Sequence, residues 1–293
     1  MSELVEYHSI AALVKQAEAE GRLISALVLE DQAAALEQRP EELVRKMRET
    51  LEVMRRAAEK GAVQELRSTS GLSGGDGFRM AAYAEGNPLS GAFCAQAIVR
   101  ALAIAEYNAA MGKIVAAPTA GSCGILPAAV LTMMDQRGLG EDAAVMALFT
   151  AGAFGMVIAK EASIAGAEGG CQAECGSAAA ISAAALVELS GGSPAMAAEA
   201  CAMALKNQLG LVCDPVAGLV ESPCIKRNAG GVMCAIGAAE MALAGIRSLI
   251  PVDEVIAAMA EVGRSLPESL RETSRGGLAA TPTALALKQK LFG

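Results

Sequence analysis

Two cysteines in one short segment are the residues of this chain best suited to chemistry. The segment CDPVAGLVESPCIKRNAGG, residues 213–231, begins with Cys213 and contains Cys224, and a proline lies close to each. Because proline removes a backbone donor and interrupts a helix, a loop is expected here. A loop that fixes two thiolates at a set separation suits a metal site, which requires at least one further ligand.

A third cysteine in polar surroundings is Cys171, in the stretch AGAEGGCQAECG. A Gly pair precedes it at the expected start of a helix. Cys175 lies four residues later, on the same face of that helix, and could serve as a fourth ligand. Three other cysteines lie in Ala- and Met-rich helical runs, where small buried hydrophobes are expected: Cys94, Cys201 and Cys234.

The spacing of Cys171, Cys213 and Cys224 matches neither a zinc finger nor a ferredoxin. Scattered free thiols are therefore one interpretation. If all three bind metal, a closed structural zinc site would still lack its fourth ligand. An iron–sulfur cluster held by three cysteines would instead leave one iron free to act as a Lewis acid.

Gly-rich polar loops accompany the cysteines, as expected for a shared site. The loop at 68–88 begins STSGLSGGDG, which fits no nucleotide-binding pattern. We predict that it binds a small anion through Ser68, Ser70 and Gly71. A further loop, 163–176, leads into the Cys171 helix.

The segment APTAGSCG, residues 117–124, is a second anion-binding candidate. A helix is expected to follow it, and the free N–H groups at a helix start attract a carboxylate. Thr119, Gly121 and Ser122 would complete that site. Ordinary capping of the helix by Ser122 is the alternative.

The acid–base groups are few. His8 is the only histidine and lies in the polar N-terminal part, so a histidine-based catalytic triad within this chain is not expected. The ionisable groups nearest the cysteine loops are Glu168, Glu174, Lys226 and Arg227. We select Lys226 and Glu168 as candidate bases, although each could be a paired structural charge.

The elements that must position these loops are helices. Aromatic residues make up only 3% of the chain, Ala, Leu and Met are abundant, and apolar alternation never extends beyond a few residues. We therefore predict an all-α fold. The helices are expected near residues 9–20, 24–38, 41–61, 89–111, 124–136, 141–160, 172–190, 193–209, 229–245, 251–264 and 279–291.

Charge is distributed unevenly along the chain. Residues 1–67 carry 23 of the 56 charged side chains, whereas residues 88–250 carry 20. We predict a charged N-terminal helical region, 1–62, and a helical domain that carries the cysteines, 63–293, joined as one continuous domain.

The composition also excludes several partners and locations. A net charge of −8 argues against nucleic acid. The longest uncharged run, Ile114 to Met134, is broken by prolines and glycines, so no membrane span is predicted. The polar N-terminus lacks a signal peptide, which favours the cytoplasm.

Taken together, four segments resemble the iron–sulfur L-serine dehydratase family: SxSGLSGGD, APTAGSCGILPA, SIAGAEGGCQAECGSA and CDPVAGLVESPCIKRNA. The resemblance extends from about residue 65 to 290, and the length resembles the alpha subunit of the two-subunit form. It implies a helical catalytic domain that holds a 4Fe–4S cluster through Cys171, Cys213 and Cys224. It also implies deamination of L-serine to pyruvate and ammonia without pyridoxal phosphate, and a separate beta subunit with an ACT-like fold.

Two residues depart from the pattern of that family. Cys175 stands where an apolar residue is usual, and Glu161 stands where an amide is expected. Two alternative functions are a related cluster-dependent lyase, such as an L-cysteine desulfidase, and a non-catalytic iron–sulfur or zinc-binding redox sensor.

Overall fold

Helix α9 (Ser177–Leu189) forms the centre of the structure, a computed structural model that describes residues 5–293. Eleven of its residues are buried, and six of the thirteen are alanine. Small side chains allow neighbouring helices to approach closely. The neighbours that contact it most are α6 (Ile125–Arg137), α7 (Glu141–Glu161), α10 (Pro194–Lys206) and α11 (Cys224–Leu243).

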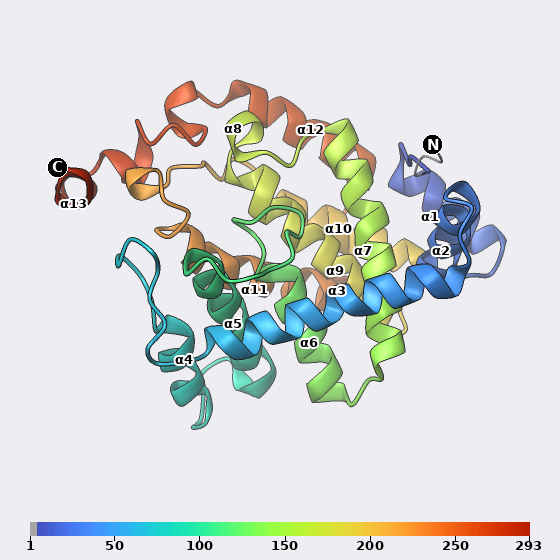
Figure 1. Ribbon diagram of the computed structural model, residues 1–293. Helices are drawn as coiled ribbons and strands as arrows, with labels where there is room; N and C mark the ends of the chain where they lie inside the picture. The colour runs from blue at the N-terminus through green and yellow to red at the C-terminus, as the bar shows by residue number, and fades with distance from the viewer. Residues whose placement is uncertain (1–4) are drawn as a thin grey trace.

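The remaining helices surround this centre (Figure 1). They are α1 (Ile10–Ala19), α2 (Ile24–Ala35), α3 (Pro40–Gly61), α4 (Asp76–Ala84), α5 (Gly91–Ala109), α8 (Gly166–Gly169), α12 (Val252–Ser265) and α13 (Pro282–Phe292). Within residues 5–293 there is no strand, only a single parallel bridge between Cys213 and Arg271. The predicted all-α fold is confirmed.

Two helix starts differ from the sequence prediction. Helix α4 lies within the segment expected to be a loop, where the run of glycines concealed it. Gly75, with a φ of 79°, precedes it in the left-handed region that favours glycine. Helix α11 begins at Cys224, five residues earlier than expected, directly after Pro223. Cys224 is therefore a helix residue and not a loop residue.

The start of α9 is also irregular. A five-residue π-helical turn, η1 (Gln172–Gly176), runs directly into it. Cys171 immediately precedes η1, and Glu174 and Cys175 lie inside it. Such π turns are rare and often occur at functional sites.

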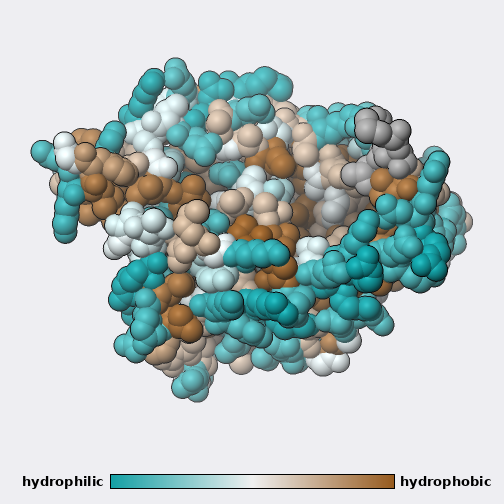
Figure 2. Space-filling view, viewed as in Figure 1, coloured by the Kyte–Doolittle hydropathy of each residue, from teal (hydrophilic) through white to brown (hydrophobic). Residues whose placement is uncertain are grey.

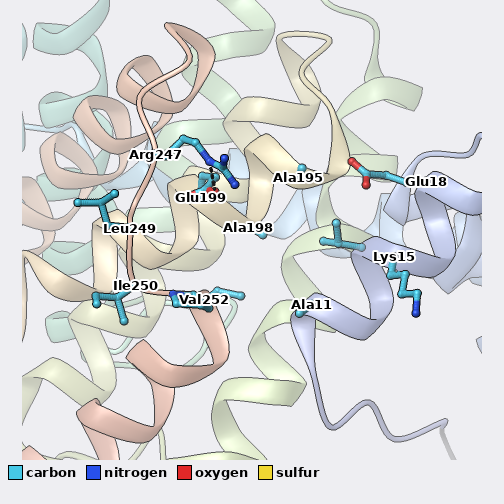
Figure 3. A pocket seen from close by; sticks show the side chains of 12 residues that line it. Ala11, Lys15, Glu18, Ala195, Ala198, Glu199, Arg247, Leu249, Ile250 and Val252 are labelled. Carbon is cyan, nitrogen blue, oxygen red and sulfur yellow. Dashed lines mark hydrogen bonds and ion pairs between the residues drawn. The ribbon is translucent and has the colours of Figure 1, made fainter.

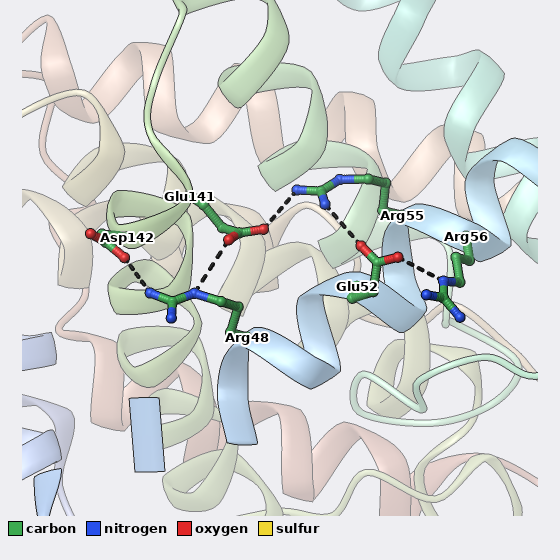
Figure 4. A network of polar contacts seen from close by, with 6 residues as sticks. All are labelled: Arg48, Glu52, Arg55, Arg56, Glu141 and Asp142. Atoms are coloured by element: carbon green, nitrogen blue, oxygen red, sulfur yellow. Dashed lines mark hydrogen bonds and ion pairs between the residues drawn. The ribbon is translucent and has the colours of Figure 1, made fainter. Parts of the chain in front are cut away.

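An ion-pair network holds the charged helix α3 against the start of α7 (Figure 4). Glu141 accepts from Arg55 at 3.1 Å and lies 3.3 Å from Arg48, which also pairs with Asp142 at 2.5 Å. Acidic residues in the first turn of α7 also complement its helix dipole. Since these side chains are at least partly exposed, each pair contributes little to the free energy of folding on its own.

Helix α7 is the one helix among the described residues that is long and apolar enough to cross a membrane. In this structure 61% of its most apolar window is buried within the protein. Its side chains Phe149 and Phe154 belong to the main hydrophobic core. This burial fits a core helix.

The C-terminal segment leaves the bundle and crosses the cysteine loops. It contains two short 3-10 turns, η3 (Glu268–Leu270) and η4 (Gly277–Ala280), before α13. Helix α13 packs mainly against η4 and against η2 (Val216–Gly218), the turn after Cys213. It projects from one end of the molecule (Figure 1).

Candidate active site

Three cysteines predicted as metal ligands come from three separate segments. Cys171 precedes the π turn, Cys213 lies between α10 and η2, and Cys224 begins α11. All three are buried. Burial raises the pKa of Cys213 and Cys224, the latter to about 12, and the negative charge of a Cys171 thiolate raises both further.

Cys175 is the nearest thiol to Cys171, with 3.4 Å between the two sulfur atoms. A hydrogen bond from Cys175 lowers the pKa of Cys171, and the Arg227 guanidinium lowers it further. The same bond, together with burial, raises the pKa of Cys175. The surroundings of Cys171 therefore favour its thiolate form.

Glu174 lies between a cysteine and a predicted substrate loop. Its Oε1 accepts a 2.8 Å hydrogen bond from Thr119 Oγ1, and its Oε2 is 3.8 Å from Cys213 Sγ. A Cβ added to Gly166 would stand 2.7 Å from Oε2, so a larger residue there would displace the Glu174 carboxylate. Burial raises the pKa of Glu174.

A buried ion pair connects the Cys213 segment to α11. Arg227 donates to Asp214 Oδ1 at 2.7 Å and to the carbonyl oxygen of Val212 at 2.8 Å. Asp214 Oδ2 accepts from the backbone N–H of Leu278 at 2.7 Å. A buried ion pair is stable when further hydrogen bonds satisfy both of its charged groups, as they do here. The pair holds Cys213 between α11 and the C-terminal segment.

The predicted serine loop meets the cysteine segment at Glu221, a buried carboxylate. Ser70 Oγ donates to Glu221 Oε1 at 2.7 Å, and Ser73 Oγ donates to Oε2 at 2.5 Å. Ser68 Oγ lies 3.3 Å from Ser70 Oγ, and Gly71 turns the loop with a φ of 77°. Glu221 was not selected from the sequence, although it stands three residues before Cys224.

Asn228 organises the second predicted loop. Its Oδ1 accepts from the N–H of Gly124 at 2.8 Å, and its Nδ2 donates to the carbonyl oxygens of Gly121 and Cys224 at 2.8 and 3.0 Å. One N–H that was expected to be free for an anion is therefore already paired. Ser122 does not cap α6 and lies 3.1 Å from the Thr119 hydroxyl.

The two candidate bases do not lie among the cysteines. Lys226 pairs with Asp76, and 63% of its side chain is exposed. Since α11 begins at Cys224, a residue two positions later lies on another face of the helix. Glu168 is an exposed residue that accepts from Ser163 Oγ at 2.7 Å.

The histidine and Glu161 also lie away from this region. His8 Nδ1 is 3.1 Å from Glu161 Oε1, and both side chains are substantially exposed. The departure from the family pattern at Glu161 is therefore a surface feature. It does not change the charge around the cysteines.

Within residues 5–293, no three His, Cys, Asp or Glu side chains are grouped closely enough to hold a single metal ion. The available donors are buried sulfur atoms with the Arg227 cation beside Cys171. Soft sulfur donors suit iron–sulfur chemistry better than they suit hard cations. The cysteines therefore fit a sulfur-ligated cluster by donor type.

A separate groove lies between α1, α10 and the segment before α12 (Figure 3). It has a volume of about 630 Å³, and Arg247 pairs with Glu199 at 3.5 Å along its wall. No cysteine lines it. It is distinct from the candidate active site.

Comparison with known sequences decides the family. The family model described as serine dehydratase alpha chain matches residues 19–279. The chain belongs to this family. The resemblance found in the four loops is thereby confirmed, and the cysteine, serine and Thr119 segments all lie within the matched region.

Individual members of the serine dehydratase family match over nearly the whole chain. A probable L-serine dehydratase alpha chain of Bacillus subtilis is 48% identical over 288 residues, covering 98% of this chain and 96% of the relative. The L-serine dehydratase alpha chain of Peptoniphilus asaccharolyticus is 45% identical, covering 90% of each. An L-serine dehydratase of Streptomyces coelicolor is 40% identical, with 91% of this chain but 59% of the relative covered.

Proposed function

We propose that this chain is the catalytic subunit of an L-serine ammonia-lyase, which converts L-serine to pyruvate and ammonia by β-elimination of water. The family membership supports the reaction. The observation that carries the site is Glu174, which contacts both Thr119 and Cys213. This carboxylate joins the predicted cofactor ligands to the predicted substrate loop.

The proposed cofactor is a 4Fe–4S cluster held by Cys171, Cys213 and Cys224. The family supports this ligand set, because all three cysteines lie within the matched region. When bound, an iron without a cysteine ligand would supply a Lewis acid for the departing hydroxyl. Arg227 offsets the negative charge of the sulfur ligands, and its bond to Asp214 fixes its position.

The proposed substrate site consists of Ser68, Ser70 and Gly71 from one loop with Thr119, Gly121 and Ser122 from the other. Ser70 and Thr119 now donate to Glu221 and Glu174, so both hydroxyls are held at the site with defined orientations. Hydroxyls held in this way can bind and orient a substrate carboxylate. The Glu174 carboxylate is suited to the ammonium group. We do not propose Lys226 or Glu168 as catalytic bases, because Lys226 pairs with Asp76 and Glu168 bonds to Ser163.

The proposed partner is a beta subunit with an ACT-like fold. The relatives that match end to end are named alpha chains, whereas the Streptomyces coelicolor relative is longer than this chain. Helix α13 exposes 53% of Leu285 and 64% of Phe292. Hydrophobic side chains gather at that end of the molecule (Figure 2). Residues 266–293 carry four basic and two acidic side chains on a chain whose net charge is −8, which suits an acidic partner surface.

We propose that the protein acts in the cytoplasm. The test of its function uses an anaerobic preparation of the chain. Iron and acid-labile sulfide per chain, with a visible spectrum, report the cluster, and pyruvate formation from L-serine reports the reaction. Sulfide release from L-cysteine without pyruvate formation from L-serine would instead support a desulfidase. Cluster content without any turnover, even with the partner present, would support a redox sensor.

A further inference from the structure

A second cavity lies behind the Cys171 turn. It has a volume of about 350 Å³ and is formed by α8, η1, α12 and the segment after η3. Helices α8 and α12 are neighbours at this edge of the bundle (Figure 1). Its lining includes the charged residues Glu168, Arg264 and Arg271, and none of the serine and Thr119 loop residues. It is therefore separate from the proposed substrate site.

Arg271 lines this cavity and carries a buried donor without an acceptor. Its Nε is buried and has no hydrogen-bond partner among the described residues. Buried donors without an acceptor are rare in folded proteins and require an explanation. A second guanidinium, from Arg264 in the last turn of α12, lines the same cavity. Two guanidinium groups that line one cavity favour a carboxylate, which arginine binds with paired hydrogen bonds.

The cavity also contains a group of opposite charge. Glu168 lines it and is held by a 2.7 Å hydrogen bond from Ser163, which leaves the other carboxylate oxygen available. A carboxylate and two guanidinium groups in one small cavity match the ammonium and the carboxylate of a zwitterion. The ligand class that fits is a free α-amino acid.

The walls of the cavity connect directly to two of the proposed cluster ligands. The residues on either side of Arg271 hold the backbone of Cys213: its N–H donates to Leu270 O at 2.9 Å, and Glu272 N–H donates to its carbonyl oxygen at 2.8 Å. Gln172, which follows Cys171, lines the opposite wall and donates to Met259 O at 3.0 Å. A ligand that fixes Arg271 against α12 would therefore restrain both ligand segments.

We propose that this cavity is an effector site for a free α-amino acid, and that its occupancy slows loss of the cluster by holding Cys171 and Cys213 in place. The binding step depends only on the cavity. The effect on the cluster rests on the proposed function.

The binding test uses L-alanine, an amino acid without the hydroxyl that the elimination needs. The protein is the anaerobically purified chain that carries Ser70→Ala and Thr119→Ala, so that binding to the proposed substrate site is already weakened. Calorimetry should detect L-alanine binding to this protein. Adding Arg264→Met should weaken that binding about tenfold or more, because a charge-assisted bond is lost.

The matched control is Arg275→Met, which removes a guanidinium that pairs with Glu268 outside the cavity. It should leave L-alanine binding unchanged. Pyruvate, which has a carboxylate but no ammonium, should bind more weakly than L-alanine, and Glu168→Gln should remove that preference. Equal binding by the Arg264→Met protein, or no binding at all by the substrate-loop variant, would overturn the site. Tighter binding of pyruvate would overturn the amino-acid assignment.

The effect on the cluster is measured separately, as the rate at which a chelator removes iron. L-Alanine should slow that rate several-fold in the otherwise unaltered protein and leave it unchanged in Arg264→Met. An unchanged rate with saturating L-alanine would overturn the regulatory step. If the protein holds no iron, the proposed cofactor fails, but the calorimetric result still decides whether the cavity binds an amino acid.

Discussion

Thr119 Oγ1 donates a 2.8 Å hydrogen bond to Oε1 of Glu174, and the other oxygen of that carboxylate lies 3.8 Å from Cys213 Sγ. One side chain from the π turn thus touches a residue of the predicted substrate loop and a predicted cluster ligand. The contact joins segments that are 55 residues apart in sequence. A change at Thr119 should therefore affect substrate binding more than global stability.

The first prediction concerns the substrate loops. Ser70→Ala and Thr119→Ala should each raise the apparent Michaelis constant for L-serine, by about 1 kcal/mol or more in binding free energy, because a bond to a charged group is lost. Thr69→Ala is the matched control, since its hydroxyl contacts only the backbone oxygen of Ala109 among the described residues. Steady-state kinetics and thermal unfolding should be measured together. A loss of stability with unchanged kinetics would contradict the prediction.

The second prediction concerns the proposed ligands. Replacing Cys171, Cys213 or Cys224 by Ala should abolish both the bound iron and the pyruvate formation, because each cysteine comes from a different segment and no neighbour can replace it. Cys94→Ala and Cys234→Ala should retain both and affect only packing. Iron and sulfide analysis of each variant provides the measurement. Full activity after the loss of any one of the three cysteines would show that the ligand set is wrong.

The third prediction concerns Cys175, whose sulfur lies 3.4 Å from that of Cys171. The resemblance to the dehydratase family implies an apolar residue at this position, so a ligand is not expected there. Cys175→Ala should therefore retain the cluster. Cys201→Ala, which empties an equally buried position in α10, controls for packing loss. Loss of iron in Cys175→Ala alone would identify Cys175 as a fourth ligand and leave no open iron.

The residues predicted from sequence and those found by the structure differ for a physical reason. Cys171, Cys213 and Cys224 could be selected because Gly, Pro or charged neighbours distinguish them from helix-core cysteines. Lys226 was selected because it is near Cys224 in sequence, yet on a helix that begins at Cys224 it points to another face. Arg227 and Asn228, three and four residues after Cys224, share its side of α11 and make the site contacts.

Long-range polar contacts could not be predicted from one sequence. Glu221 meets Ser70 across 151 residues, and Asn228 meets Gly121 across 107. Locally, neither residue differs from an ordinary helix-end or helix residue. The helical fold was predictable because its evidence is local composition and periodicity, whereas the partner of a buried polar group depends on tertiary packing.

The fourth prediction concerns stability and pH. Burial raises the pKa of Glu188, whose Oε2 accepts from Thr150 at 2.6 Å. Between its unfolded and folded pKa values the native state binds more protons than the unfolded state, so the contribution of Glu188 to stability falls as pH rises through that interval. Glu188→Gln should therefore gain stability relative to the natural protein at neutral pH and lose that advantage in acid. Denaturant unfolding followed by helical circular dichroism, with exposed Glu261→Gln as control, measures the difference.

The last prediction concerns the proposed beta subunit. Helix α13 exposes Leu285 and Phe292 and rests on η4 and η2, and η2 directly follows the Cys213 segment. A partner that covers α13 would also restrain the proposed cluster site, where elimination requires exclusion of water. The cluster-loaded chain alone should therefore form pyruvate poorly, and adding the beta subunit should restore turnover.

Leu285→Ser with Phe292→Ser should weaken this association and the restored activity in parallel, without loss of iron. Leu249→Ser, which replaces a side chain that is 91% exposed in a different part of the structure, should leave both unchanged. Full turnover by the isolated chain at every concentration would contradict the need for a partner. Unchanged association of the α13 variant would show that the interface lies elsewhere on the chain. It would not contradict the need for a partner.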